Sequence, residues 1–212
     1  MSSRVLAVDT TGDTGSIALI GDGRLIEQVM LQSSDGFAHL LFGAIEELLA
    51  KYRLTIRDIH AFASASGPGS FTGVRVGLTA VKGLAEATGR KVIAISNLQA
   101  LASFGTRPLR AVVIDARRGE IFGAAYDDRL EIVCDEVVMK FDAWLRGLPQ
   151  REMEFITAGF DADFPGPVIH APRTFAGAIG TIAAAQIDRA QDPALIDANY
   201  VRRSDAELHW KE

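Results

Sequence analysis

The second half of the chain begins with the same pattern as the first. Residues 112–115 read Val-Val-Ile-Asp and residues 6–9 read Leu-Ala-Val-Asp, so an apolar run ends at an aspartate in both places. A glycine and two further β-forming segments follow each run. An apolar run of this length that ends at a turn residue is typical of a buried strand. The repeat therefore predicts two related subdomains, residues 1–107 and a smaller one at 108–212, each opening with a β-meander.

Within the first subdomain the pattern predicts the order βββαβαβα. Asp22-Gly23 lies between two β-forming runs, which is a strong hairpin signal. Gly89 is placed to end one helix and Ser96 to begin another. The expected strands are 5–8, 16–20, 24–32, 60–65 and 92–95, and the expected helices are 35–52, capped by residues 33–35, then 72–88 and one from residue 96. In the second subdomain the later strands are expected near 130–138, 155–158 and 168–170, and helices near 141–146 and 175–190.

A glycine-rich loop, residues 66–75, reads Ser-Gly-Pro-Gly-Ser-Phe-Thr-Gly-Val-Arg and joins a predicted strand to a predicted helix. Such a loop directs backbone N–H groups and the positive end of the helix dipole to one place, which suits an anion or a closely approaching backbone. It is not a nucleotide-triphosphate loop, because Val74-Arg75 follows Gly73 where Lys-Ser or Lys-Thr is needed. It is not a nucleophile elbow either, since Pro68 and Thr72 flank Ser70 at the glycine positions. A tight turn that caps a helix is the alternative. Gly69 and Gly73 are expected to need a positive φ or a close approach.

Read together with Asp9-Thr10-Thr11 and with residues 115–120, this loop resembles the TsaB (YeaZ) family, bacterial proteins needed to make threonylcarbamoyladenosine in tRNA. The order of motifs matches from Leu6 to about Tyr126, and residues 199–203 resemble the tail of the family. Residues 127–197 contain no specific motif. The resemblance implies an α/β protein of the actin-like ATPase superfold (ASKHA, ribonuclease H-like), with two related subdomains that each carry a mixed sheet flanked by helices.

The resemblance also implies a function. The chain would be a non-catalytic scaffold or activating subunit that pairs with TsaD, the catalytic subunit that transfers threonylcarbamoyl to adenosine 37 of tRNA. The ATPase TsaE would be a further partner, and TsaC-type enzymes would supply threonylcarbamoyl-AMP. Transfer RNA would be reached through the complex, and a homodimer is expected when the partner is absent. The chain would have no cofactor of its own, and any nucleotide would lie at an interface with a partner.

The alternative is a small actin-fold kinase or nucleotide hydrolase that uses Asp9 and Asp115 in its own cleft. Both aspartates end predicted strands, where open α/β sheets bind ligands, and in catalytic relatives such carboxylates orient magnesium or water. Each aspartate could instead cap its own turn. The candidate anion or nucleotide contacts are Asp9, Thr10, Thr11, Gly69, Ser70, Arg75 and Asp115. Lys82, Arg117 and Arg118 are candidate contacts for phosphates or acidic partners, although the two adjacent arginines could also be solvated.

The predicted helix at 35–52 bears on metal binding and on assembly. TsaD-like proteins carry two histidines at i and i+4 on the corresponding helix, a spacing that places both on one face. Here Gly43 follows His39 at that spacing, so neither a metal site nor peptidase activity is expected. The apolar stripe of this helix is broader than one core face requires. Its predicted partner interface comprises Phe37, His39, Leu40, Phe42 and Leu48, with Phe37 and Phe42 expected to be exposed.

Composition sets independent limits. With 22 Lys and Arg against 27 Asp and Glu, the formal net charge is -5, the wrong sign for a protein that grips a polyanion by itself. Cys134 is the only cysteine, which excludes an internal disulfide and a cysteine-based zinc site. The first residues lead directly into a strand, and no run reaches the roughly 20 apolar residues of a membrane span. A cytoplasmic protein without a membrane partner is therefore expected.

Overall fold

The computed structural model describes residues 3–201, which form two compact units. Unit 1 comprises residues 3–100 and 172–198, and unit 2 comprises residues 101–171 and 199–201. Unit 1 therefore includes a segment that the chain supplies only after most of unit 2. The subdomain boundary expected near residue 107 stays a prediction.

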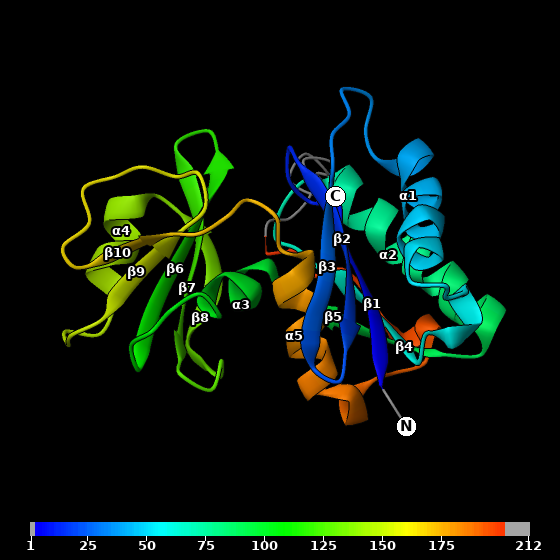
Figure 1. The fold of residues 1–212 in the computed structure, drawn as a ribbon. Helices are drawn as coiled ribbons and strands as arrows, with labels where there is room; N and C mark the ends of the chain where they lie inside the picture. Colours follow the sequence, from blue (N-terminus) through cyan, green and yellow to red (C-terminus); the bar gives the residue numbers. More distant parts are fainter. Residues whose placement is uncertain (1–2, 202–212) are drawn as a thin grey trace, which may run out of the picture. The chain divides into compact units, whose positions relative to one another are not determined.

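Unit 1 is built on a five-stranded mixed sheet, sheet A (Figure 1). Its strands lie in the order β3-β2-β1-β4-β5. β1, β2 and β3 form the predicted antiparallel meander, and β4 and β5 run parallel to β1. Asp22 (φ 50°) and Gly23 (φ 76°) make the predicted tight hairpin turn. The strands are β1 (Arg4–Asp9), β2 (Gly15–Gly21), β3 (Arg24–Leu31), β4 (Ala61–Ala65) and β5 (Lys91–Ile95).

Helices cover both faces of sheet A (Figure 1). α1 (Ala38–Lys51) and α2 (Phe71–Thr88) lie on one face, and α5 (Ala176–Ala185) lies on the other. Between α1, α2 and the sheet lies an apolar core that includes Leu6, Ile17 and Leu41. Gly89 ends α2 in the left-handed conformation (φ 63°), as predicted. α3 (Asn97–Ala102) and the 3-10 turns η1 (Ile56–Asp58), η2 (Ile187–Arg189) and η3 (Pro193–Leu195) complete the element order.

Two predicted helix limits are wrong. α1 begins at Ala38 and not at residue 35, because Gly36 has a φ of 85°, which is not a helical conformation. Phe37 is the N-cap residue and makes no side-chain cap bond, so the expected polar cap at residues 33–35 is not formed. The helix expected at 175–190 ends at Ala185, where a 3-10 turn replaces it.

Unit 2 repeats the strand order of unit 1. In chain order its strands are β6 to β10, and the sheet reads β8-β7-β6-β9-β10, with the same parallel and antiparallel pairs as sheet A. The two mixed sheets with flanking helices confirm the predicted fold class. The bounds are β6 (Leu109–Arg117), β7 (Glu120–Asp127), β8 (Ile132–Met139), α4 (Phe141–Gly147), β9 (Glu154–Thr157) and β10 (Val168–His170).

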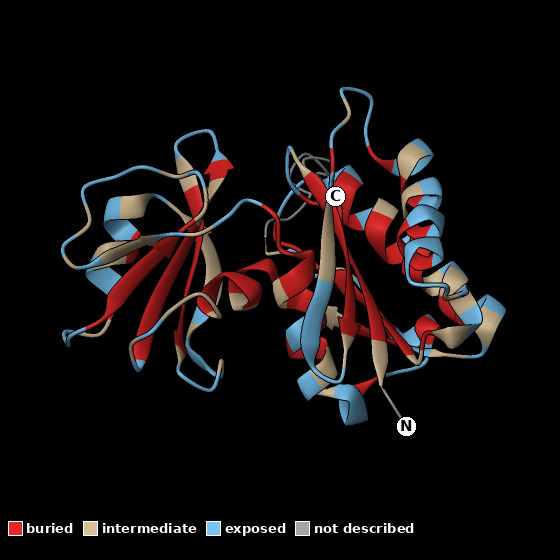
Figure 2. Ribbon diagram, viewed as in Figure 1, coloured by how far each residue is buried: buried red, intermediate tan, exposed pale blue. Residues whose placement is uncertain are grey.

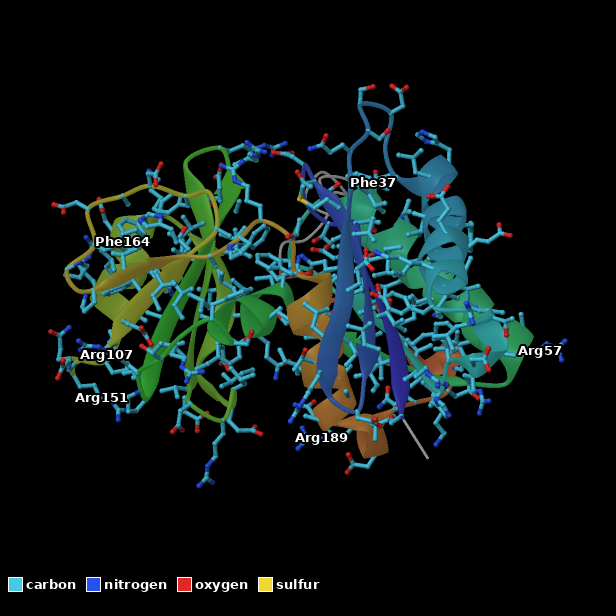
Figure 3. The ribbon with its side chains drawn as sticks, in the orientation of Figure 1. Phe37, Arg57, Arg107, Arg151, Phe164 and Arg189 are labelled. Atoms are coloured by element: carbon cyan, nitrogen blue, oxygen red, sulfur yellow. The ribbon has the colours of Figure 1, made fainter. Side chains whose placement is uncertain are left out.

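A loop takes the place of a helix between β9 and β10. Aromatic rings pack against α4 here: Phe164 lies 5.2 Å from Phe141 and 5.4 Å from Phe155, measured between ring centroids (Figure 3). Stacked and edge-on rings of this kind add stability beyond their buried area. The described chain ends in unit 2, where the Asn199 side chain donates to Glu136. Residues 202–203 of the predicted tail motif lie outside the described residues. Within 3–201, every helix is too short or too polar to cross a membrane.

Candidate functional site

The turn after β1 and the start of α2 are in direct contact. The Thr10 hydroxyl donates to the Gly73 carbonyl (2.6 Å), and the Ser70 N–H donates to the Thr11 carbonyl (2.8 Å). A Cβ at Gly73 would overlap the Thr10 carbonyl oxygen, and one at Gly69 would lie 2.8 Å from that of Thr11. The close backbone approach predicted for these glycines is therefore confirmed.

Of the two alternatives expected for Gly69 and Gly73, the close approach applies and the positive φ does not. In this loop it is Gly67 that has one (φ 103°), just before the cis peptide bond to Pro68. The two later glycines have ordinary φ values, and they are needed because a neighbouring backbone leaves no room for a side chain. The constraint is packing and not backbone strain.

Several backbone N–H and C=O groups of the loop already have hydrogen-bond partners within the chain. The Ser70 hydroxyl accepts from the Gly73 N–H (3.2 Å) and so caps α2, while the Ser70 carbonyl accepts from Val74 (2.8 Å). The Gly67 carbonyl accepts from the Asn97 N–H (2.8 Å). This geometry supports the alternative of a turn that caps a helix. Anion contacts at Gly69 and Ser70 stay a prediction.

Asp9 lies at the end of β1 and is 1% exposed. Its Oδ1 accepts from the Thr11 N–H (3.0 Å) and the Thr11 hydroxyl (2.6 Å), and its Oδ2 accepts from the Phe175 N–H (3.3 Å). Burial raises the pKa of Asp9, because it disfavours the charged form, while the bonds from Thr11 and Phe175 oppose that shift. Both carboxyl oxygens are thus engaged by the chain itself.

Asn97 extends this network and was not among the predicted site residues. Its Nδ2 donates to the Thr11 hydroxyl and to the Pro68 carbonyl (3.0 Å), so it joins the turn after β1 to the glycine-rich loop. The side chain is 2% exposed. The Ser96 hydroxyl accepts from the Leu98 N–H (3.1 Å), as expected of a helix start. This capping pattern does not predict the role of Asn97, the next residue. The partners of Asn97 lie more than 25 positions away in the chain, so no local sequence pattern predicts its role.

Arg75 is the fifth residue of α2, near its N-terminal end, and is exposed. Its guanidinium lies 3.8 Å from the centroid of the Phe71 ring, which is 42% exposed. The aromatic face stabilises the cation at a helix end where the dipole disfavours it. The predicted role of Arg75 as an anion contact remains a prediction.

Asp115 lies two residues before the end of β6, the equivalent strand of unit 2, and is more exposed than Asp9. Its Oδ1 accepts from the Arg117 N–H (2.8 Å), and its Oδ2 lies 3.7 Å from the Arg117 guanidinium. The side chain is 37% exposed. Arg117 and Arg118 have φ values of 65° and 57°, so they form a tight left-handed turn. Asp115 caps that turn, and its nucleotide role also stays a prediction.

The predicted interface on α1 is only partly at the surface. Phe37, expected to be exposed, is 8% exposed: its ring lies over Gly15, where a Cβ would be 3.1 Å away (Figure 3). Leu48 is 3% exposed and belongs to the same core. Phe42 is 54% exposed, His39 and Gly43 are exposed, and Leu40 is half-buried. Exposed and buried residues alternate along α1 (Figure 2). The exposed part of α1 is therefore narrower than its apolar stripe.

Residues 3–201 hold no group of three or more His, Cys, Asp or Glu side chains that could bind a metal ion together. His39 lies on the exposed side of α1, four residues before Gly43.

Comparison with known proteins places the chain in a family. A family model described as "TsaD: tRNA N6-adenosine threonylcarbamoyltransferase" matches residues 32–203. The chain is 28% identical to the tRNA threonylcarbamoyladenosine biosynthesis protein TsaB of Bacillus subtilis over 98% of both chains. It is 36% identical to TsaB of Escherichia coli, over 58% of this chain and 54% of that protein.

A solved structure agrees with these matches. The structure of YeaZ from Pseudomonas aeruginosa covers 93% of this chain and 99% of its own, with a TM-score of 0.79 and 24% identity. The same fold thus extends over both units. The chain belongs to the family whose model is named for TsaD, and within it to the TsaB (YeaZ) group.

Proposed function

We propose that the chain is a non-catalytic scaffold or activating subunit in the synthesis of threonylcarbamoyladenosine in tRNA. It pairs with a TsaD-like catalytic subunit that transfers threonylcarbamoyl to adenosine 37. The single observation that supports the non-catalytic role is the hydrogen bonding of the Asp9 carboxyl group. The carboxylate stands where catalytic relatives of this fold hold magnesium or water, and both of its oxygens accept hydrogen bonds from the chain itself.

The surface that meets the catalytic subunit is the exposed side of α1. Phe42 (54% exposed), His39 and Gly43 lie there, with Leu40 beside them. A large exposed aromatic ring is a typical anchor of a protein interface. The same surface forms a homodimer when the partner is absent.

The remaining components follow from the same assignment. A TsaE-like ATPase joins the complex, tRNA is bound through the complex, and any nucleotide lies at an interface with a partner. The chain needs no cofactor of its own, works in the cytoplasm, and has no membrane partner. The assigned role contrasts with the transferase named by the family model, because a fold alone does not determine activity.

The test is a reconstitution with two matched variants. Phe42→Asp changes an exposed side chain of α1, and Ile132→Asp changes one of nearly equal exposure (56%) on β8 of unit 2. Phe42→Asp is expected to weaken binding to the TsaD-like subunit and to lower tRNA modification at least tenfold, because it puts a charge into an apolar contact. Ile132→Asp is expected to do neither. Equal effects of the two variants would contradict the assigned surface.

The kinase or nucleotide hydrolase alternative has its own readout. The isolated chain is expected to show no magnesium-dependent ATP turnover and no threonylcarbamoyl transfer until the TsaD-like subunit and its ATPase partner are added. Turnover by the isolated chain that is lost in Asp9→Ala would replace the scaffold assignment with the kinase-like one.

A further inference from the structure

The first turn of α5 is held by side chains of three neighbouring strands. The Phe175 N–H donates to Asp9 Oδ2 (3.3 Å), the Ala176 N–H to the Ser16 hydroxyl (3.2 Å), and the Gly177 N–H to Gln28 Oε1 (2.6 Å). The acceptors come from β1, β2 and β3 in turn. The first N–H groups of a helix have no partner within the helix, so they need acceptors from elsewhere.

These acceptors lie together because of the register of sheet A. Asp9 on β1 pairs directly with Ser16 on β2, and Gln28 on β3 pairs with Ala18 on β2. Gln28 also holds the chain just before the helix, since its Nε2 donates to the Thr174 hydroxyl (3.0 Å). Ordinary helix caps are supplied by the residue next to the helix, yet Phe175, the local N-cap residue, makes no side-chain cap bond.

We propose that Asp9, Ser16 and Gln28 form a non-local cap for α5, and that this cap fixes the returning segment 172–198 onto sheet A. Asp9 is a positioning residue in this arrangement. The backbone of α5 occupies the carboxylate oxygen that a ligand or a metal ion would otherwise use. The proposal does not depend on the function proposed above.

Packing further along α5 limits where this helix can lie on the sheet. A Cβ at Gly180 would lie 2.5 Å from Ile20 and 3.0 Å from Ala7, and a Cβ at Gly177 would lie 2.8 Å from Gln28 Oε1. A small slide or rotation of the helix would bring larger neighbours into those contacts. The three caps set the start of the helix, and the glycines let its backbone lie against the strands.

The internal repeat provides a matched comparison. Asp115 occupies the position of Asp9 in unit 2 and also accepts from the N–H two residues later. Its second oxygen lies near the Arg117 guanidinium of its own turn, and not against a helix N–H. A role in capping a local turn is thus common to both aspartates, whereas the bond to a distant helix belongs to Asp9.

The geometry predicts the effect of an isosteric change. Asp9 uses Oδ1 for two donors of Thr11 and Oδ2 for Phe175, but Asn has a single acceptor oxygen. In Asp9→Asn the oxygen stays with Thr11, and the amide NH2 then faces the Phe175 N–H. Asp9→Asn is therefore expected to break the α5 cap while the turn after β1 is kept.

The experiment is amide hydrogen exchange and amide chemical shift by NMR on the full chain. Asp9→Asn is expected to speed exchange at Phe175 about tenfold, the factor that a cap of ordinary strength gives. Ser16→Ala is expected to affect Ala176 most, and Gln28→Ala to affect Gly177 most. Gln28→Glu keeps the acceptor and is expected to leave Gly177 protected, and Asp115→Asn is expected to leave all three amides unchanged.

The pattern separates capping from general destabilisation. Each substitution must change its own amide more than the amides of α2, which share the unit but not the cap. If Asp9→Asn leaves the exchange rate and shift of Phe175 at the wild-type values, the cap does not exist. If the three substitutions speed exchange equally throughout unit 1, they act on stability in general, and the proposal is wrong.

Discussion

The carboxyl group of Asp9 is almost completely removed from solvent, and its pKa is raised because burial disfavours the charged form. The hydrogen bonds from Thr11 and Phe175 act in the opposite direction but do not cancel the effect of burial. The folded state therefore holds a proton on Asp9 at pH values where the unfolded chain has already released it.

This shift predicts how stability depends on pH. A group with a raised folded pKa contributes stability that is fully present below its unfolded value of 3.8 and is lost as the pH rises through the folded pKa. We expect the free energy of unfolding of the wild type, minus that of Asp9→Asn, to increase as the pH is lowered through this window. Above the folded pKa the difference should be flat. Denaturant titrations at several pH values measure it, and a difference that decreases toward low pH would contradict the raised pKa.

At the scale of the element, α2 shows how two glycines determine where a helix can lie. Gly73 meets the Thr10 carbonyl, and a Cβ at Gly77 would lie 2.8 Å from the Thr10 hydroxyl oxygen and 3.1 Å from that of Ser64. Gly83 is on the same helix, is exposed, and has no atom within 4 Å of its Cβ position. A side chain at position 73 or 77 would therefore collide with its neighbours, whereas one at position 83 would not.

Alanine substitutions are expected to separate these places. Gly73→Ala should lower the free energy of unfolding by about 3 kcal/mol or more, because backbone atoms must move to admit the methyl group. Gly83→Ala should raise it by about 0.5 to 1 kcal/mol, since alanine is the better helix former and meets nothing. Denaturant unfolding of both variants tests the pair. A stable Gly73→Ala variant would mean that the loop after β1 can move away from α2.

Elements with local signals could be predicted from the sequence. The turn at Asp22-Gly23, the end of α2 at Gly89 and the strand that ends at Asp9 each depend on residues that are adjacent in the chain. The start of α1 was misplaced, because the serines and aspartate before it looked like a cap, whereas the conformation of Gly36 delays the helix. Here two local signals compete, and the conformation of Gly36 outweighs the polar residues before it.

The buried position of Phe37 and the bond between Asp9 and Phe175 could not be predicted in this way. Phe37 is buried because Gly15, on another element, leaves room for its ring. The partner of Asp9 is supplied by a residue 166 positions away. A close approach at Gly69 and Gly73 is expected from the sequence, but the identity of the neighbouring backbone, at Thr10 and Thr11, depends on tertiary structure. The hydrogen bonds of this turn to Asn97 and of Asp9 to Phe175 depend on it too.

At the scale of the whole molecule, net charge is the property that bears most on the relation to tRNA. The chain carries 22 basic and 27 acidic side chains, for a formal net charge of -5. A polyanion binds chiefly through the release of counterions by Lys and Arg, and a protein of net negative charge repels it at long range. In the complex proposed above, another component is therefore expected to hold the RNA.

We expect the isolated chain to bind tRNA no more tightly than non-specific proteins do, with a dissociation constant of about 10⁻⁴ M or weaker at physiological salt. Adding the TsaD-like subunit should produce tight binding with a salt dependence set by the basic residues of that subunit. Filter binding at two salt concentrations, with the chain alone, the partner alone and the mixture, measures each contribution. With the Phe42→Asp variant, the mixture should bind tRNA no more tightly than the partner alone. The substitution removes this chain from the complex but leaves the partner's own RNA contacts intact. Tight binding by the isolated chain, weakened steeply by salt, would show that local basic residues overcome the net charge and that the chain contacts tRNA directly.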